Sequence, residues 1–348
     1  MQPLMAKLGA YLKHPAVKVL LVLPFSVLLL YLAFREVELD SFLASFRGAN
    51  VSWITIAVLI STASFFVRAV RWQQLMNVER RTVSFFDALY GLLFGYFVNL
   101  LIPRAGEVGR CTLVAKRTQL PLATTLGTVV TERLIDLIST LIVTLLAVIV
   151  SFDRFGSFLW ETVLAPFFAS FSSTKVFVLL ALFLGVFLVF LLLFYLLRSG
   201  RFGNRLRNWW NEKKAALWAG MQSIVKLKSK WLFVVYTLLL WGCYWLMAYT
   251  ISLALPATAQ LGGAASLAIL VVGTFGMIIP AQGGIGSFHL AVVLWLAVEG
   301  VARPDALAYA TLSHEGQILL YVVFLALCYL FTFVRKRTKS NTDGQGKK

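Results

Sequence analysis

Three groups of ionisable side chains interrupt long apolar stretches of this chain, and their spacing suggests what each could bind. Arg104, Glu107 and Arg110 lie three residues apart, so on a helix Glu107 can pair with either arginine. The other guanidinium would keep free N–H donors, and a planar fork beside free backbone amides suits a phosphate group. We therefore expect an anion site here, with Asn99 hydrogen-bonding backbone groups close by.

The other two groups can change protonation state. They are Glu132, Arg133 and Asp136 within one apolar run, and His289, His314 and Glu315 around another. Glu132 and Asp136 face the same side of a helix because they are four residues apart. Histidine is the side chain most easily switched near neutral pH. Charges inside a membrane span cost roughly 2.5–3.5 kcal/mol each, so they require either structural ion pairs or a polar pathway, and both readings stay open.

The first and third groups each follow a short motif that occurs twice. Residues 101–110 read LIPRAGEVGR and residues 278–287 read IIPAQGGIGS. Proline and glycine should break the helix in both apolar regions. We expect the hairpin hinges at Pro103, Gly106, Gly109, Pro280, Gly283, Gly284 and Gly286. A duplicated helix break at membrane depth points to the binding site of a transporter.

The composition is that of a polytopic membrane protein. The 348 residues are 59% hydrophobic and have a mean hydropathy of +0.82. The uncharged runs 177–197, 231–255 and 316–334 are each long enough to cross ~30 Å of hydrocarbon. The net charge of +17 is explained by loops on the cytoplasmic side, so we expect no nucleic-acid partner. The cysteines show no metal-ligand spacing, and we expect neither a metal nor a cofactor.

The distribution of Lys and Arg between loops predicts an inverted repeat. Basic segments mark the cytoplasmic side and include both termini, 68–84, 103–121 and 198–230. If these basic segments lie on the cytoplasmic side, residues 85–121 must enter and leave the membrane by the cytoplasmic face. Residues 264–300 must then enter and leave it by the external face. We therefore expect two re-entrant helical hairpins. The alternative, in which each hairpin is two ordinary spans, gives ten crossings with the same parity.

The expected fold is a single all-α membrane domain over residues 1–348 with about six full transmembrane helices and the two hairpins. The spans are expected near 18–34, 51–70, 126–152, 175–197, 231–255 and 316–334. Residues 1–155 and 175–340 would be repeats of inverted topology, an arrangement typical of alternating access. Residues 198–230 are expected to form a basic amphipathic connector on the inner leaflet, held by anionic lipids.

Three ordered motifs resemble the lysylphosphatidylglycerol synthase transmembrane family, also described as flippase-like or UPF0104. They are N-x3-P-R-A-G-E-x-x-R from Asn99 to Arg110, E-R-x-x-D from Glu132 to Asp136, and P-A-x-G-G-I-G from Pro280 to Gly286. In full-length bacterial synthases of that family, a membrane domain that flips the lipid precedes a soluble aminoacyl-transferase domain. We find no counterpart of the soluble domain here, so the resemblance implies lipid translocation rather than lysyl transfer.

The expected function is movement of an anionic phospholipid or polyprenyl-phosphate-linked lipid between leaflets of a bacterial inner membrane. The protein would be a flippase or scramblase and not an enzyme, with both termini cytoplasmic, and proton coupling and a homodimer are left open. Headgroup contacts are expected from Asn99, Arg104, Glu107, Arg110 and Arg133, and a coupling pathway from Glu132, Asp136, His289, His314 and Glu315.

Two other classes of protein stay open at this point. A membrane-embedded glycosyl- or other transferase would use Glu36, Glu38 and Asp40 as metal-binding acids. An ion-coupled transporter of a small soluble anion would need an enclosed cavity.

Overall fold

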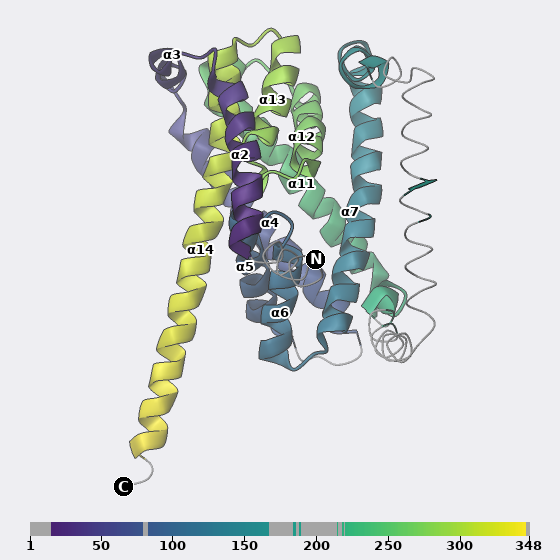
Figure 1. Ribbon diagram of the computed structural model, residues 1–348, viewed down its shortest axis with the longest axis vertical. Helices are drawn as coiled ribbons and strands as arrows, with labels where there is room; N and C mark the ends of the chain where they lie inside the picture. Colours follow the sequence, from purple (N-terminus) through teal and green to yellow (C-terminus); the bar gives the residue numbers. More distant parts are fainter. Residues whose placement is uncertain are drawn as a thin grey trace, which may run out of the picture.

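The computed structural model in Figure 1 describes residues 15–78, 83–166 and 220–345, and also residues 184, 185, 188, 214 and 218. Within this part of the chain every regular element is a helix. Four helices are long and apolar enough to cross a membrane: α4 (Val51–Met76), α7 (Leu122–Val150), α11 (Lys230–Ala254) and the Arg303–Val334 part of α14 (Arg303–Gln345). The chain is therefore an all-helical membrane protein with several candidate spans.

Most of the expected spans coincide with a helix in the structure. The first lies within α2 (Pro15–Phe34), of which Leu23–Phe34 ranks among the shorter apolar helices. The last is part of a much longer helix than expected, because α14 already begins at Arg303. The expected span 175–197 and most of the connector 198–230 lie outside the described residues, so the count of six stays an expectation.

Two pairs of shorter helices are each interrupted at one of the repeated motifs. The first pair is α5 (Phe85–Leu101) and α6 (Gly106–Thr118), and the second is α12 (Gly263–Ile278) and α13 (Ser287–Val298). Even α5, with 17 residues, extends only ~26 Å, which is less than the ~30 Å of hydrocarbon in a bilayer. Figure 1 shows the first pair in the lower half of the molecule and the second pair in the upper half.

The first break turns at an arginine. Arg104 has a φ of 60°, in the left-handed region that side chains other than glycine rarely adopt. Asn99 then closes the break, because its Oδ1 accepts a hydrogen bond of 2.7 Å from the Gly106 N–H. The structure places Gly106 and Gly109 inside the first turns of α6, away from the bend where we expected them. Their role is close packing, since a Cβ on Gly106 would lie 2.1 Å from the Gly95 carbonyl oxygen.

The second break turns at glycines. Gly283, Gly284 and Gly286 all have positive φ, at 59°, 83° and 84°, which glycine adopts without a steric penalty. The break also packs against α2. The Gln282 N–H donates a hydrogen bond of 2.9 Å to Ser26 Oγ. The two breaks are thus built differently, although their sequences are similar.

The remaining elements connect and support these helices. They are α3 (Leu39–Ala44), π-helical segments at Phe152–Gly156 and Leu159–Leu164, and 3-10 turns at Gln222–Ile224, Pro256–Thr258 and Gln282–Gly284.

Two clusters of buried apolar side chains form the core. One cluster includes Trp295 of α13 and Tyr309 of α14. A second joins α4, α5 and α6 around Trp72 and Leu92. Each helical pair therefore has its own core, and α14 contributes to both.

Candidate functional site

The helices α4, α6 and α7 bring a network of charged side chains together in the interior. Glu132 of α7 lies at its centre, with a fully buried side chain. Its Oε1 accepts a hydrogen bond of 3.0 Å from Arg68 Nε, and its Oε2 lies 2.8 Å from Arg110 Nη2. One carboxylate from α7 thus joins guanidinium groups from two other helices.

Two further carboxylates complete the network. Asp136 accepts a hydrogen bond of 2.6 Å from Arg71 Nη2. Glu107 lies 2.7 Å from both Arg110 and Arg133. We call this network the ion cluster; its members are Arg68, Arg71, Glu107, Arg110, Glu132, Arg133 and Asp136. With four guanidinium groups and three carboxylates, the ion cluster carries one net positive charge.

Aromatic rings support the buried arginines of the ion cluster. The Arg110 guanidinium lies 4.5 Å from the Trp72 ring centroid, and that of Arg71 lies 5.9 Å from the Phe233 centroid. Such cation–π contacts gain strength where water is excluded. Trp72 is fixed in turn by a 3.1 Å hydrogen bond from its Nε1 to Thr128 Oγ1. The guanidinium groups are therefore held in set orientations rather than left free to reorganise.

Arg68 and Arg71 are the two functional candidates that the sequence reasoning missed. Their positive charges were counted with a cytoplasmic loop over residues 68–84. The structure instead extends α4 to Met76, so both arginines lie within the helix and are buried. The sequence did contain a signal for them. Two arginines three residues apart share one face of a helix, and the residues around the neighbouring Trp72 are apolar.

A cavity of about 340 Å³ lies beside the ion cluster, and we call it the central cavity. Its walls come from α4, α5, α11, α12, α13, α14 and the second break. Arg68 is the one permanently charged residue among the described residues that line it. Arg68 Nη1 donates hydrogen bonds to the hydroxyls of Tyr96 at 3.0 Å and Tyr244 at 3.4 Å. Arg68 thus connects the ion cluster to the lining of the central cavity.

Both helix breaks meet at the central cavity. Asn99, which closes the first break, and Gly283 of the second break line the same space. Arg104 does not pair with Glu107, although the spacing allowed it. Its Nη2 instead donates a hydrogen bond to the Ile278 carbonyl oxygen at the end of α12. This arginine therefore links the two broken helical pairs and does not belong to the ion cluster.

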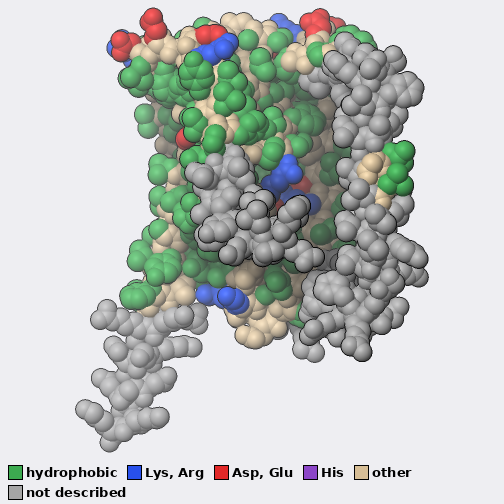
Figure 2. All heavy atoms as spheres, viewed as in Figure 1, with side chains coloured by type: hydrophobic (Ala, Val, Ile, Leu, Met, Phe, Trp, Pro, Cys, Tyr) green, Lys and Arg blue, Asp and Glu red, His purple; other side chains and the backbone are tan. Residues whose placement is uncertain are grey.

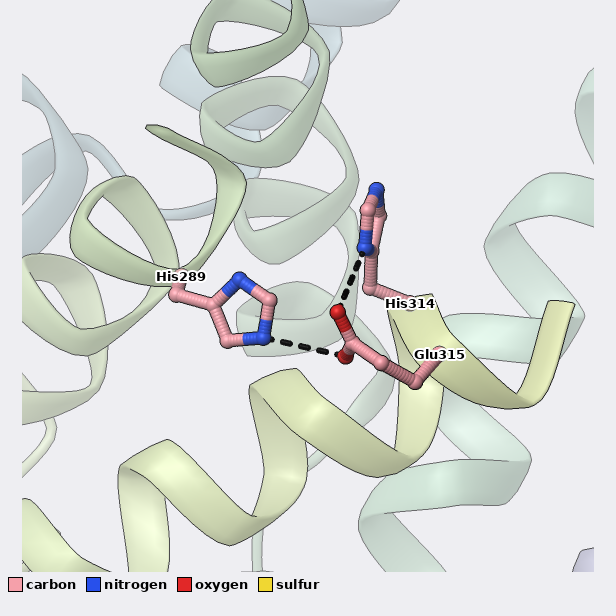
Figure 3. A group of neighbouring side chains, drawn as sticks. All are labelled: His289, His314 and Glu315. Carbon is pink, nitrogen blue, oxygen red and sulfur yellow. Dashed lines mark hydrogen bonds and ion pairs between the residues drawn. The ribbon is translucent and has the colours of Figure 1, made fainter. Parts of the chain in front are cut away.

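The third predicted group also assembles, as Figure 3 shows. Glu315 lies between two imidazoles, with its Oε2 3.0 Å from His289 Nε2 and its Oε1 3.1 Å from His314 Nδ1. His314 Nε2 lies 3.0 Å from the Gly283 carbonyl oxygen, which can only accept, so this nitrogen donates. His314 also lines the central cavity. We call these three residues the His–Glu group; they connect the second break to the cavity.

The His–Glu group can hold a cation. Two imidazoles and a carboxylate are common metal ligands, and their ligand atoms lie within 4.8 Å of one another. In this conformation, however, the Gly286 N–H donates to His289 Nδ1, so His289 Nε2 carries the hydrogen that points to Glu315. The arrangement therefore fits a bound proton better than a metal ion.

The acids considered for a transferase lie elsewhere. Glu36 is ion-paired with Arg35 at 3.0 Å and with Arg303 at 2.9 Å. Glu38 precedes α3 and Asp40 lies in its first turn. Glu36 thus already has two cationic partners, which leaves it poorly suited to hold a metal ion.

Figure 2 shows where charge reaches the surface of the described part of the chain. Basic and acidic side chains gather at the upper end of the molecule, and basic side chains are visible at the lower end. Others lie in a hollow at mid-height, where the surrounding described side chains are mostly hydrophobic. Charged side chains at membrane depth are costly and require partners or water.

An apolar helical bundle with two interrupted helical pairs defines a polytopic membrane protein. The family described as the lysylphosphatidylglycerol synthase TM region matches residues 16–327, and the chain belongs to this family.

Similarity to curated relatives is low and partial. The chain is 23% identical over 121 residues to UPF0104 membrane protein MJ1595 of Methanocaldococcus jannaschii, covering 34% of this chain and 35% of the relative. It is 28% identical over 103 residues to UPF0104 membrane protein PH1989 of Pyrococcus horikoshii, covering 28% of this chain and 31% of the relative. The matches thus span about a third of each relative's length. No solved structure matches the chain.

Proposed function

We propose that the protein moves lipids with an anionic, phosphate-bearing headgroup between the two leaflets of the membrane, as a transporter and not as an enzyme. The headgroup would bind in the central cavity at Arg68, while the hydrocarbon chains stay in the bilayer. The observation that carries the proposal is the net positive charge of the ion cluster, which faces the cavity through Arg68. Arg68 is paired with Glu132 and lies 3.8 Å from Asp136, and in this proposal a phosphate oxygen accepts from its Nη1 in place of a tyrosine hydroxyl.

The arrangement of the broken helices supports a carrier mechanism. All four helices of the two pairs are shorter than a membrane crossing, which favours re-entrant hairpins. The pairs occupy opposite halves of the molecule in Figure 1, as hairpins entering from opposite faces would. In this proposal the two halves are inverted repeats, and the cavity opens in turn to either leaflet. The His–Glu group would couple the second break to proton uptake, because His314 contacts both Gly283 and the cavity.

The proposed setting is a bacterial inner membrane with both termini in the cytoplasm. Membership of the lysylphosphatidylglycerol synthase TM family supports a role with membrane lipids.

Arg68→Gln tests the proposal in vesicles that contain the purified full chain and phosphatidylglycerol with a fluorescent tail. The variant leaves three guanidinium groups against three carboxylates in the ion cluster, so the cluster stays balanced and the protein should fold. We expect the flipping rate, measured by dithionite quenching, to fall about tenfold, because a charge-assisted hydrogen bond contributes ~1.5–3 kcal/mol.

Arg35→Gln is the matched control, since Arg35 is exposed and pairs with exposed Glu36. It should flip lipid at the wild-type rate. A folded Arg68→Gln protein with wild-type flipping would contradict the proposal, and so would wild-type vesicles that flip no faster than protein-free ones.

A further inference from the structure

The lining of the central cavity points to the chemical class of the headgroup, given that the proposed function holds. Four residues of α14 line the cavity at steps of four along the helix: Tyr309, Ser313, Gln317 and Tyr321. Positions four apart share one face of a helix, so this face is polar over three turns of an otherwise apolar segment. Uncharged polar side chains at this depth are costly unless they bind something polar.

The opposite walls continue the same chemistry. Ser64 of α4, Tyr96 and Asn99 of α5, Tyr244 of α11 and Thr274 of α12 add hydroxyl and carboxamide groups. Hydroxyls and carboxamides both donate and accept hydrogen bonds, as the hydroxyls of a polyol do. The lining is thus complementary to a group with several hydroxyls.

Some of these polar atoms remain available to a ligand. Gln317 donates from Nε2 to the Ser313 carbonyl at 3.0 Å, which leaves its Oε1 as an acceptor. The hydroxyls of Tyr96 and Tyr244 accept from Arg68, so the hydrogen of each hydroxyl can still be donated. By contrast, the Tyr309 hydroxyl already donates to the Ala248 carbonyl at 2.7 Å. Gln317, Tyr321, Tyr96 and Tyr244 are therefore the best candidates for direct contacts.

The charge of the lining argues against a cationic headgroup. Among the described residues that line the cavity, none is Asp, Glu or Lys. Of the 15 acidic residues in the sequence, the structure describes the side chains of all except Glu79, Glu212 and Asp343. The carboxylates next to the lining already have partners: Glu132 and Asp136 pair with arginines of the ion cluster, and Glu315 lies between His289 and His314. An ammonium group in the cavity would meet Arg68 and His314, whose carboxylate partners are already engaged.

We infer that the central cavity selects a phosphate that carries an uncharged, hydroxyl-rich group such as glycerol, inositol or a sugar, and that it rejects an aminoacylated headgroup. Arg68 binds the phosphate, and the polar face of α14 binds the hydroxyls. The cavity volume of about 340 Å³ is at the lower end of the ~300–1,000 Å³ range of ligand pockets, which suits one headgroup without its hydrocarbon chains.

The test compares four lipids with identical fluorescent tails in vesicles containing the full chain: phosphatidylinositol, phosphatidylglycerol, phosphatidic acid and lysylphosphatidylglycerol. We expect phosphatidylinositol to flip about tenfold faster than phosphatidic acid, because two additional hydrogen bonds to its hydroxyls would lower the barrier by that amount. Lysylphosphatidylglycerol should flip most slowly. Gln317→Met and Tyr321→Phe should each lower the ratio of the first two rates. Leu319→Met, which changes a side chain of α14 that is 67% exposed, should leave the ratio unchanged.

Each other outcome overturns a stated part of the argument. Equal rates for phosphatidylinositol and phosphatidic acid, or fastest flipping of lysylphosphatidylglycerol, overturn the inference while lipid translocation stands. No flipping of any lipid overturns the proposed function itself. Soluble inositol 1-phosphate is added as a competitor; if the vesicles accumulate it while no lipid flips, the cavity serves the free headgroup and not the lipid.

Discussion

At the scale of single residues, the balance of charge in the ion cluster decides which substitutions the protein can tolerate. Arg68 lies at the edge of the ion cluster, where the cluster meets the lining of the central cavity. Glu132 lies at the centre, with two carboxylate oxygens shared among arginines of α4 and α6. Removing the edge cation leaves a balanced ion cluster, whereas removing the central anion leaves four cations against two carboxylates.

Glu132→Gln should therefore destabilise the protein strongly. Breaking a buried ion pair by removing one partner costs ~3–5 kcal/mol, because the remaining charge stays buried without compensation. We expect a clear loss of folded, monodisperse protein in mild detergent and a lower thermal midpoint.

Glu36→Gln provides the comparison, because Glu36 pairs with Arg35 and Arg303 at the surface, where an ion pair contributes ~0–1 kcal/mol. A Glu132→Gln protein as stable as Glu36→Gln would show that the arginines do not depend on this carboxylate. Glu132 would then be free to act in proton coupling, as its position in the sequence first indicated.

The sequence could identify most members of these clusters but not their partners. Glu107 and Arg110 are three apart on one helix, and their pairing follows from local geometry. Glu132 and Arg68 are 64 residues apart, so only the packing of α4 against α7 reveals their contact. Arg104 shows the reverse difficulty: its spacing allowed a pair with Glu107, but its left-handed backbone directs it to Ile278.

At the scale of elements, the two breaks could be predicted from proline and glycine in apolar runs, but their construction could not. The same residue types served different purposes in each. Glycines take left-handed φ at the second break, whereas Gly106 in the first pair allows α6 to approach α5. Close helix contact through small residues is a common way to join helices in membranes.

Gly106→Ala should separate α5 from α6. Its Cβ would lie 2.1 Å from the Gly95 carbonyl oxygen and 2.6 Å from Asn99 Cγ, so backbone must move. Overpacking of this kind costs ~1–3 kcal/mol or more. We expect a lower thermal midpoint and faster hydrogen exchange over residues 99–110.

Gly242→Ala is the matched control. Gly242 lies in helix α11, and a Cβ added to it would meet no atom within 4 Å. Its stability should equal or slightly exceed that of the wild type, since alanine favours a helix more than glycine does. If Gly106→Ala is equally stable, the two helices of the first pair are not held as closely as the structure indicates.

At the scale of the whole molecule, the order of a long helix, a broken pair and a long helix occurs twice, as α4, α5/α6, α7 and as α11, α12/α13, α14. The helical fold could be predicted from hydropathy, and the broken pairs from proline and glycine within the apolar runs. The orientation of each element in the membrane depends on loop charge and stays a prediction.

Labelling of single cysteines tests that orientation in a background with Cys111, Cys243 and Cys328 replaced. Gln119 follows α6 and Gln260 lies between α11 and α12, and both are exposed. Gln119→Cys should react with an impermeant maleimide only from the cytoplasmic side, and Gln260→Cys only from outside. Labelling of Gln119→Cys from outside would rule out the inverted hairpins, and also the ordinary spans of the same parity.

The hydrogen bond from Arg104 to the Ile278 carbonyl has a consequence for the cell that houses this protein. The two breaks are fastened to each other, so separating them leaves a carbonyl without a donor in a region of low dielectric constant. Opening is therefore expected to be brief and infrequent. A membrane rich in this protein should therefore keep its electrical insulation, and its ion gradients should not run down.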